Sequence, residues 1–132
     1  ITPTEREARI ALGKQEEGIE WIANKLIEET YSEKLVLKLG AEGFISYSKN
    51  NDNSLERHYF PAINSNQIDV DGAGDALLST LACGLSSNSC WKNTCVLGAI
   101  VASLAVQRLG NVPIKKEEVQ DFVGKVFSKD EE

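Results

Sequence analysis

The chain has 132 residues, of which 42% are hydrophobic and 26% charged, and it carries a formal net charge of −6. This length and composition predict a single folded domain with a buried core and exclude a disordered chain. The excess of acidic residues argues against nucleic acid or an anionic membrane as the partner, because both require a basic protein face.

The predicted elements follow from hydrophobic periodicity and from the positions of Gly and Pro. Thr2, Pro3 and Glu5 have the spacing of an N-cap, a first helical residue and the acid of a capping box, and Gly13 ends that helix. In chain order we expect helices over 3–12 and 15–30, strands over 35–39, 44–48 and 55–60, and helices over 75–85, 91–108 and 115–127. This order predicts an α/β layer architecture, compatible with one half of a larger doubly wound sheet.

The cysteines and the apolar runs limit the class of protein. Cys83, Cys90 and Cys95 stand in apolar, helical surroundings, which predicts reduced thiols and a cytoplasmic protein. A zinc site is not expected, because His58 is the only histidine and the sequence has no CxxC pair. The longest uncharged run, 94–106, is too short to span a bilayer and predicts a buried helix.

The stretch Gly72-Ala73-Gly74-Asp75 is the strongest candidate for chemistry. Backbone N–H groups at a helix start suit a phosphate, since they are unpaired and carry partial positive charge. With a carboxylate beside them, they suggest phosphoryl transfer with Asp75 as general base. An ordinary glycine-rich turn capped by Asp71 explains the turn equally well.

Residues 69–75, which read Asp-Val-Asp-Gly-Ala-Gly-Asp, resemble the C-terminal signature of the PfkB (ribokinase-like) carbohydrate kinases, with Val70 in place of a Thr. The resemblance extends from Ile1 to the final helix. It implies the C-terminal, nucleotide-binding half of a ribokinase-like doubly wound α/β/α sandwich, forming one domain over 1–132. Because the chain lacks Met and opens on Ile1, we expect it to be a fragment of a longer protein. The wording of residues 2–9 also faintly resembles the heptose-phosphate kinase branch.

Residues 1–7 resemble the family segment Ile-Thr-Pro-Asn-x-x-Glu, which organises magnesium and phosphates through water. Glu7 matches this segment, whereas Thr4 replaces the Asn. The resemblance implies that Glu7 stands in the outer shell of Mg²⁺, and the predicted capping box uses Glu5, which leaves Glu7 free for that task. A solvated helix acid is the alternative.

Residues 38–43 resemble the nucleotide loop Thr-Leu-Gly-x-x-Gly, with a lysine in place of the Thr that is able to reach a phosphate. A turn between two antiparallel strands is the alternative interpretation. The resemblance also places one small residue of the helix over 91–108 near the adenine, although core packing explains that residue as well. The implied nucleotide contacts are Lys38, Gly40, Ala41, Gly43, Gly74 and Ala99.

Residues 105–110 resemble the segment whose backbone carbonyls help to bind a monovalent cation in many members. A helix C-cap explains the same residues. Ile114 stands where ribokinase carries a Ser hydroxyl, which leaves a requirement for K⁺ open. The implied cation ligands are Ala105, Arg108, Gly110, Asp69 and Asp71.

The resemblance implies ATP-dependent phosphorylation of a sugar or sugar-phosphate hydroxyl, with ATP and Mg²⁺ as cofactors. Asp75 would act as base, and the amides of Gly72, Ala73 and Gly74 would hold the charge on the transferred phosphoryl. The family's sugar site lies mainly in the N-terminal half, so we expect the isolated chain to be inactive. The resemblance also allows a homodimer.

Two other functions remain open. A non-catalytic nucleotide-binding or interaction module would fit the departures at Thr4, Lys38 and Val70, but it has no need of a base such as Asp75. A structural domain without a ligand would leave the Gly-Ala-Gly turn unexplained.

Overall fold

A computed structural model describes residues 1–63, 70–108 and 112–128. The chain divides into two compact units, Ile1–Ala62 and Ile63–Glu132. No helix of the described ranges is long and apolar enough to cross a membrane.

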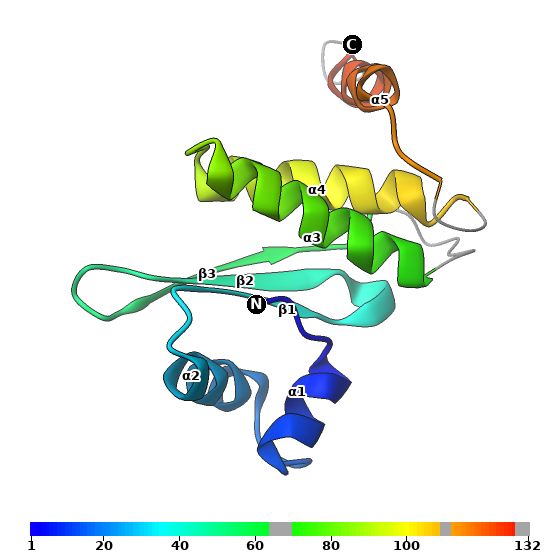
Figure 1. Ribbon diagram of the computed structural model, residues 1–132. Coiled ribbons are helices and arrows are strands. Elements are labelled where there is room, and N and C mark those ends of the chain that lie inside the picture. Colours follow the sequence, from blue (N-terminus) through cyan, green and yellow to red (C-terminus); the bar gives the residue numbers. More distant parts are fainter. Residues whose placement is uncertain (64–69, 109–111, 129–132) are drawn as a thin grey trace. The chain divides into compact units, whose positions relative to one another are not determined.

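The first unit contains a three-stranded antiparallel sheet of order β1-β2-β3 (Figure 1). Its strands are β1 (Lys34–Lys38), β2 (Phe44–Lys49) and β3 (Leu55–Phe60), each within one residue of its predicted bounds at both ends. The N-terminal segment lies parallel along β1, because the Val36 and Lys38 amides donate to the Ile1 and Pro3 carbonyls, both at 2.9 Å. The predicted strands are therefore confirmed.

Helices α1 (Glu5–Leu12) and α2 (Ile19–Thr30) cover one face of this sheet (Figure 1). The two helices and the sheet share a core that consists of Ala8, Ile22, Ala23, Leu26, Ile27, Leu35, Leu37 and Tyr47. The predicted start of α2 at Gln15 is wrong by four residues. The Arg9 guanidinium donates to the Gln15 and Glu17 carbonyls at 3.0 and 2.7 Å, so these carbonyls pair with a side chain before the helix begins.

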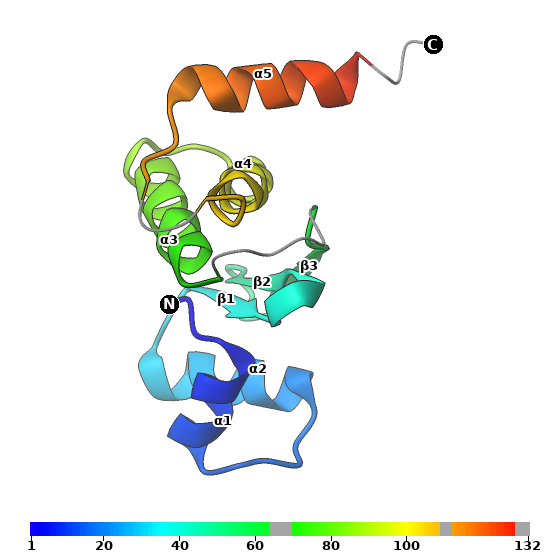
Figure 2. The same cartoon turned by 90° about the vertical axis from the view of Figure 1, so that its right-hand side faces the viewer.

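The second unit contains α3 (Val70–Ser86) and α4 (Trp91–Ala105), which lie side by side as a helical hairpin, and α5 (Lys116–Phe127) (Figure 2). Gly84 lets the backbone of α3 approach Thr94, and Gly98 lets α4 approach Leu77. Close approach at these two glycines sets the packing of the hairpin.

Two boundaries in the second unit differ from the predicted ones by more than one residue. Helix α3 begins at Val70 rather than Asp75, so the glycine-rich stretch is helical. Helix α4 ends at Ala105 rather than Arg108, because the Arg108 amide donates to the Ala105 carbonyl in a tighter turn at 3.1 Å. Along 94–106 the helix is buried on more than one side, as expected, and only Val96 and Leu97, at 42% and 43%, are exposed.

Candidate functional site

The first turn of α1 carries the acid expected to assist magnesium. Thr4 is the N-cap, its hydroxyl accepts from the Glu7 amide at 3.1 Å, and its own amide donates to Glu7 Oε2 at 2.7 Å. The predicted capping box of Thr2 and Glu5 is therefore wrong, and so is the expectation that Glu7 stands outside the box. The physical reason is that the Pro3 carbonyl pairs with β1, so the helix begins only beyond it.

The carboxylate of Glu7 remains ionised and partly available within this capping box. Hydrogen bonds from Thr4, followed by the charge of Lys38, hold the pKa of its carboxyl below the usual value of 4.5. The group is exposed and anionic at neutral pH, and the capping bond uses only one of its two oxygens. A carboxylate of this kind fits the outer shell of a hard cation that retains its waters.

The segment from Lys38 to Gly43 forms a tight turn between β1 and β2. Its centre is the short helix η1 (Gly40–Glu42), and the Leu39 amide closes the turn on the Gly43 carbonyl at 2.8 Å. Gly40 and Gly43 have φ values of +62° and +99°, which side-chain-bearing residues rarely adopt. The predicted turn between antiparallel strands is confirmed, whereas its contact with a nucleotide stays a prediction.

Glu7, Lys38 and the turn over 40–43 come together at one end of the first unit. Thr4 and Lys38 form a parallel bridge, so the carboxyl end of the N-terminal segment lies beside the carboxyl end of β1. Ligands of α/β proteins commonly bind at the carboxyl ends of parallel strands. The fold therefore gathers the candidate magnesium acid and the candidate nucleotide turn at one edge.

In the second unit, Gly72, Ala73 and Gly74 lie within the first two turns of α3, and Asp75 is an exposed residue that follows them. Amides beyond the first turn of an α-helix donate to carbonyls four residues earlier. Gly74 lies beyond that turn, which corrects the prediction that the whole stretch precedes the helix. Of the predicted cation ligands, Asp69, Gly110 and the side chain of Asp71 lie outside the part of the chain that the structure describes.

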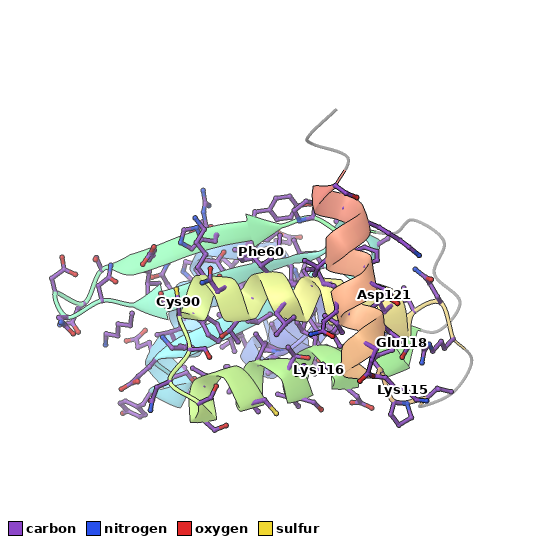
Figure 3. All side chains as sticks on the ribbon, turned by 90° about the horizontal axis from the view of Figure 1, so that it is seen from above. Phe60, Cys90, Lys115, Lys116, Glu118 and Asp121 are labelled. Carbon is purple, nitrogen blue, oxygen red and sulfur yellow. The ribbon has the colours of Figure 1, made fainter. Side chains whose placement is uncertain are left out.

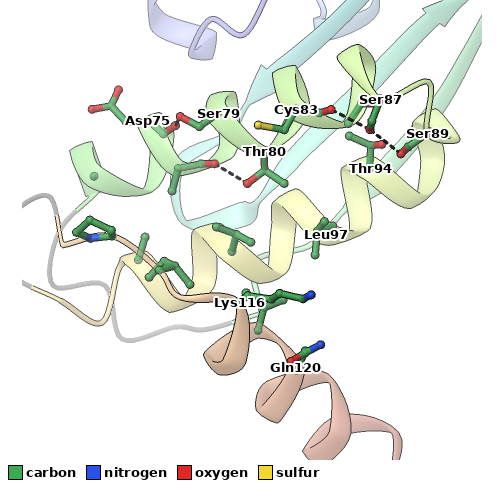
Figure 4. Close-up of a pocket in the computed structure, with 18 of the residues that line it drawn as sticks. Asp75, Ser79, Thr80, Cys83, Ser87, Ser89, Thr94, Leu97, Lys116 and Gln120 are labelled. Atoms are coloured by element: carbon green, nitrogen blue, oxygen red, sulfur yellow. Dashed lines mark hydrogen bonds between the residues drawn. The ribbon is translucent and has the colours of Figure 1, made fainter.

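A groove of about 1120 Å³ runs along the second unit between α3, α4 and the start of α5 (Figure 4). Three predicted site residues line it together, namely Gly72, Asp75 and Ala105. Small and hydroxyl-bearing side chains continue from Asp75 along α3, and Leu97 contributes from α4. Ala99 is not among the residues that line the groove, so its expected contact with adenine would have to be made elsewhere.

The Arg108 side chain joins the end of α4 to α5, a contact that the sequence did not lead us to expect. Its guanidinium donates to the Pro113 carbonyl at 3.1 Å and pairs with the Glu118 carboxylate, which also accepts from the Lys115 amide at 2.7 Å. Lys115 and Glu118 lie together at the start of α5 (Figure 3). No local sequence pattern indicates this contact, because Arg108 and Glu118 lie ten residues apart.

The predicted cation site is only partly described. The Ala105 carbonyl accepts from the Arg108 amide, and a carbonyl oxygen has a second lone pair for another partner. Within the described ranges, no three His, Cys, Asp or Glu side chains gather to hold a metal ion. The sequence resemblance implies backbone carbonyls together with Asp69 as ligands of such a cation, and Asp69 lies outside the described residues.

Comparison with known proteins gives a consistent result. The family model described as "pfkB family carbohydrate kinase" matches residues 1–119. The bifunctional protein HldE of Desulfatibacillum aliphaticivorans is 29% identical over 124 residues, which cover 91% of this chain and 24% of that relative. The ribokinase of Lactococcus lactis is 30% identical over 113 residues, which cover 83% of this chain and 33% of that protein.

Solved structures agree with these relatives. The ribokinase of Thermotoga maritima superposes with a TM-score of 0.76 and 28% identity, covering 93% of this chain and 41% of that chain. Phosphofructokinase-2 of Escherichia coli superposes with a TM-score of 0.75 at 15% identity, covering 91% of this chain and 38% of that chain, which shows the shared fold. The chain thus spans between a quarter and two fifths of the proteins that it matches, and it has the fold of part of a ribokinase-like kinase. Since the family model covers most of its length, the chain belongs to the pfkB family of carbohydrate kinases.

Proposed function

We propose that this chain supplies the nucleotide site and the catalytic base of a kinase that transfers a phosphoryl group from ATP to a hydroxyl of a sugar or sugar phosphate. The observation that carries the proposal is the position of Asp75. Its exposed carboxylate follows the glycine-bearing first turn of α3 and lines the same groove as Gly72 and Ala105. An acceptor hydroxyl in this groove would find a base beside the positive end of a helix.

In this proposal Asp75 accepts the proton of the attacking hydroxyl. The amide end of α3, with Gly72 and Ala73, stabilises the negative charge that develops on the transferred group, and one donor of this kind is typically worth roughly 3 kcal/mol. Gly74 contributes in a different way from the one expected. Because it lacks a side chain, it lets the phosphoryl group approach the backbone closely.

Each unit supplies residues that we propose as nucleotide contacts. In the first, the turn at Gly40, Ala41 and Gly43 would contact the nucleotide and Lys38 a phosphate, and in the second Ala99 would lie near the adenine. The ribokinase of Arabidopsis thaliana, whose fold is similar at 21% identity, is known in complex with ribose and ATP. Glu7 would hold Mg²⁺ through water, and bound Mg²⁺ neutralises charge on the phosphates.

A monovalent cation such as K⁺ is part of the same proposal. Phosphofructokinase-2 of Escherichia coli is known in complex with potassium. In this chain the ligands would be carbonyls and carboxylates of Ala105, Arg108, Gly110, Asp69 and Asp71. A bound cation would offset the clustered acids near the start of α3.

We further propose that the acceptor site is completed by residues outside this chain, which spans 24% of its HldE relative. The isolated chain would then bind nucleotide weakly and transfer no phosphate. The resemblance of residues 2–9 to the heptose-phosphate branch favours a sugar phosphate as acceptor. We expect a cytoplasmic protein, since its three cysteines are predicted to be reduced.

Calorimetric titration with MgATP in K⁺ buffer tests the nucleotide site. We expect the wild-type chain and Asp75→Asn to bind alike, because the base acts on the acceptor and not on ATP. In the longest natural chain that contains these residues, Asp75→Asn is expected to lower phosphoryl transfer by roughly 10²- to 10⁴-fold. Unchanged turnover in that variant would contradict the proposed role of Asp75.

A non-catalytic nucleotide-binding module is the second candidate. The observation that favours it is the capping bond of Glu7, which gives this acid a structural task. Binding of MgATP by the longest natural chain, without transfer to any of a panel of sugars and sugar phosphates, would support this alternative.

A further inference from the structure

We propose that Tyr59, at the end of β3, is a positioning residue that holds the turn over 40–43 in the shape that a nucleotide requires. The inference rests on the proposed function of this turn as a nucleotide loop. It adds a residue that lies 17 positions along the chain from the carbonyl it contacts.

The first contact is a hydrogen bond to the turn itself. Tyr59 Oη donates to the Glu42 carbonyl at 2.5 Å. Glu42 is the last residue of η1, where carbonyls lack a helical partner and are available to a side chain. The backbone of Tyr59 is fixed by its pairing with Ile45 of β2, so the hydroxyl has a defined origin. Tyr59 is 55% exposed, which makes this hydrogen bond, rather than burial, the main constraint on its side chain.

The second contact comes from the backbone that follows Tyr59. A Cβ on Gly43 would overlap the Phe60 carbonyl oxygen and lie 2.7 Å from the Ala62 nitrogen and 2.8 Å from the Pro61 carbonyl carbon. The backbone at the end of β3 therefore packs directly against Gly43, while the Tyr59 hydroxyl hydrogen-bonds the preceding residue, Glu42. The turn is fixed at two successive residues by one strand end.

A turn fixed in this way is pre-organised for a ligand. Ordering a loop at the moment of binding costs affinity, and a loop that is already ordered avoids this cost. Among the described contacts, the Tyr59 hydroxyl makes only the hydrogen bond to Glu42. A phenylalanine would fill the same space without that hydrogen bond. We therefore expect removal of this hydroxyl to loosen the turn and to weaken MgATP binding without unfolding the unit.

The experiment compares Tyr59→Phe with Tyr31→Phe, a matched control. Tyr31 is 92% exposed, and its hydroxyl has no hydrogen bond among the contacts of the described residues. Amide hydrogen exchange at Gly40–Gly43 is measured without nucleotide, and the dissociation constant for MgATP is measured by calorimetry. In Tyr59→Phe we expect exchange to accelerate and MgATP affinity to fall, each by roughly two- to tenfold, the effect of losing one hydrogen bond. Tyr31→Phe is expected to change neither.

Each outcome has a distinct meaning. Faster exchange with weaker MgATP binding supports the inference. Unchanged exchange in Tyr59→Phe overturns the anchoring role, and faster exchange with unchanged MgATP affinity overturns the link between anchoring and nucleotide. Failure of the wild-type protein to bind MgATP contradicts the proposed function and the nucleotide part of this inference, and it is recognised without any variant, while exchange still decides whether Tyr59 holds the turn.

Discussion

Thr4 and Glu7 hydrogen-bond each other twice across the first turn of α1, through the Thr4 hydroxyl at 3.1 Å and the Glu7 carboxylate at 2.7 Å. Replacing Thr4 by Ala removes one of these bonds and should lower the free energy of unfolding by about 1 kcal/mol. Glu7→Gln should lower it by less, because glutamine keeps the hydrogen bond of the capping box and loses only the favourable charge of the carboxylate at the helix start. Urea denaturation of both variants measures the difference, and equal losses would show that the charge of Glu7, rather than its capping bond, stabilises the helix.

The same pair predicts a pH dependence. Because hydrogen bonds from Thr4, and to a lesser extent the charge of Lys38, lower the pKa of Glu7, its contribution to stability is present above its usual value of 4.5. The contribution is lost as pH falls through the lower pKa of the folded state. We expect the pKa of Glu7, measured by NMR titration, to rise partway toward 4.5 in Thr4→Ala and by less in Lys38→Gln. A larger rise in Lys38→Gln would mean that charge outweighs hydrogen bonding at this site.

Tyr47 predicts a loss of stability as pH rises, the reverse of the acid-induced loss predicted for Glu7. Its side chain is fully buried and donates to Glu20 Oε1 at 2.9 Å, while Arg57 Nη1 approaches the same oxygen at 2.5 Å. Burial first, and then the Glu20 carboxylate, raise the pKa of Tyr47 well above its usual value of 10.0. The stability that depends on the neutral hydroxyl is therefore present below pH 10 and lost as pH rises further.

Tyr47→Phe tests this sign. The substitution should lower the free energy of unfolding by about 1 kcal/mol at neutral pH, the contribution of one hydrogen bond. It should also flatten the loss of stability above pH 10, because no phenol remains to ionise in the core. Urea midpoints at pH 7 and at pH 11 measure both effects. Parallel losses in wild type and variant would contradict the role of Tyr47 in alkaline unfolding.

The sequence predicted those features that depend on local pattern. The strands and the turn between Leu35 and Phe60 were predicted correctly, because they depend on short hydrophobic runs and on Gly40, Gly43 and Pro61, all within a few residues of chain. The start of α1 was missed for a physical reason. Thr2 with Glu5 and Thr4 with Glu7 have the same spacing, and the choice between them is made by pairing with β1, some 34 residues away.

The same distinction applies to the candidate site. Glu7, Lys38 and the turn over 40–43 were identified from motifs, and the fold brings them to one edge. The contacts of Tyr59 with Glu42 and of Arg108 with Glu118 were not identified, because each joins residues whose proximity depends on tertiary structure. No local periodicity encodes a hydrogen bond between the end of a strand and a turn 17 residues earlier.

The packing of α3 on α4 gives the last prediction. A Cβ on Gly84 would overlap the side chain of Thr94, with Oγ1 at 2.5 Å and Cβ at 2.9 Å. Thr94 is buried and β-branched, so its side chain has little freedom to move aside. At Gly98 the closest atom is Leu77 Cδ1, at 2.7 Å, which lies at the end of a flexible side chain. The two glycines should therefore differ in their tolerance of a methyl group.

We expect Gly84→Ala to lower the free energy of unfolding by about 1–3 kcal/mol, the usual effect of overpacking, and Gly98→Ala to lower it by less. Gly124→Ala in α5 is the matched control, because a Cβ there meets nothing within 4 Å. It should stabilise the chain by roughly 0.5–1 kcal/mol through helix propensity alone. Urea midpoints of the three variants give the order. If Gly84→Ala destabilised the protein no more than Gly124→Ala, the close approach at Thr94 would not stabilise the hairpin. The helices that line the groove beside Asp75 would then be held in place by other contacts.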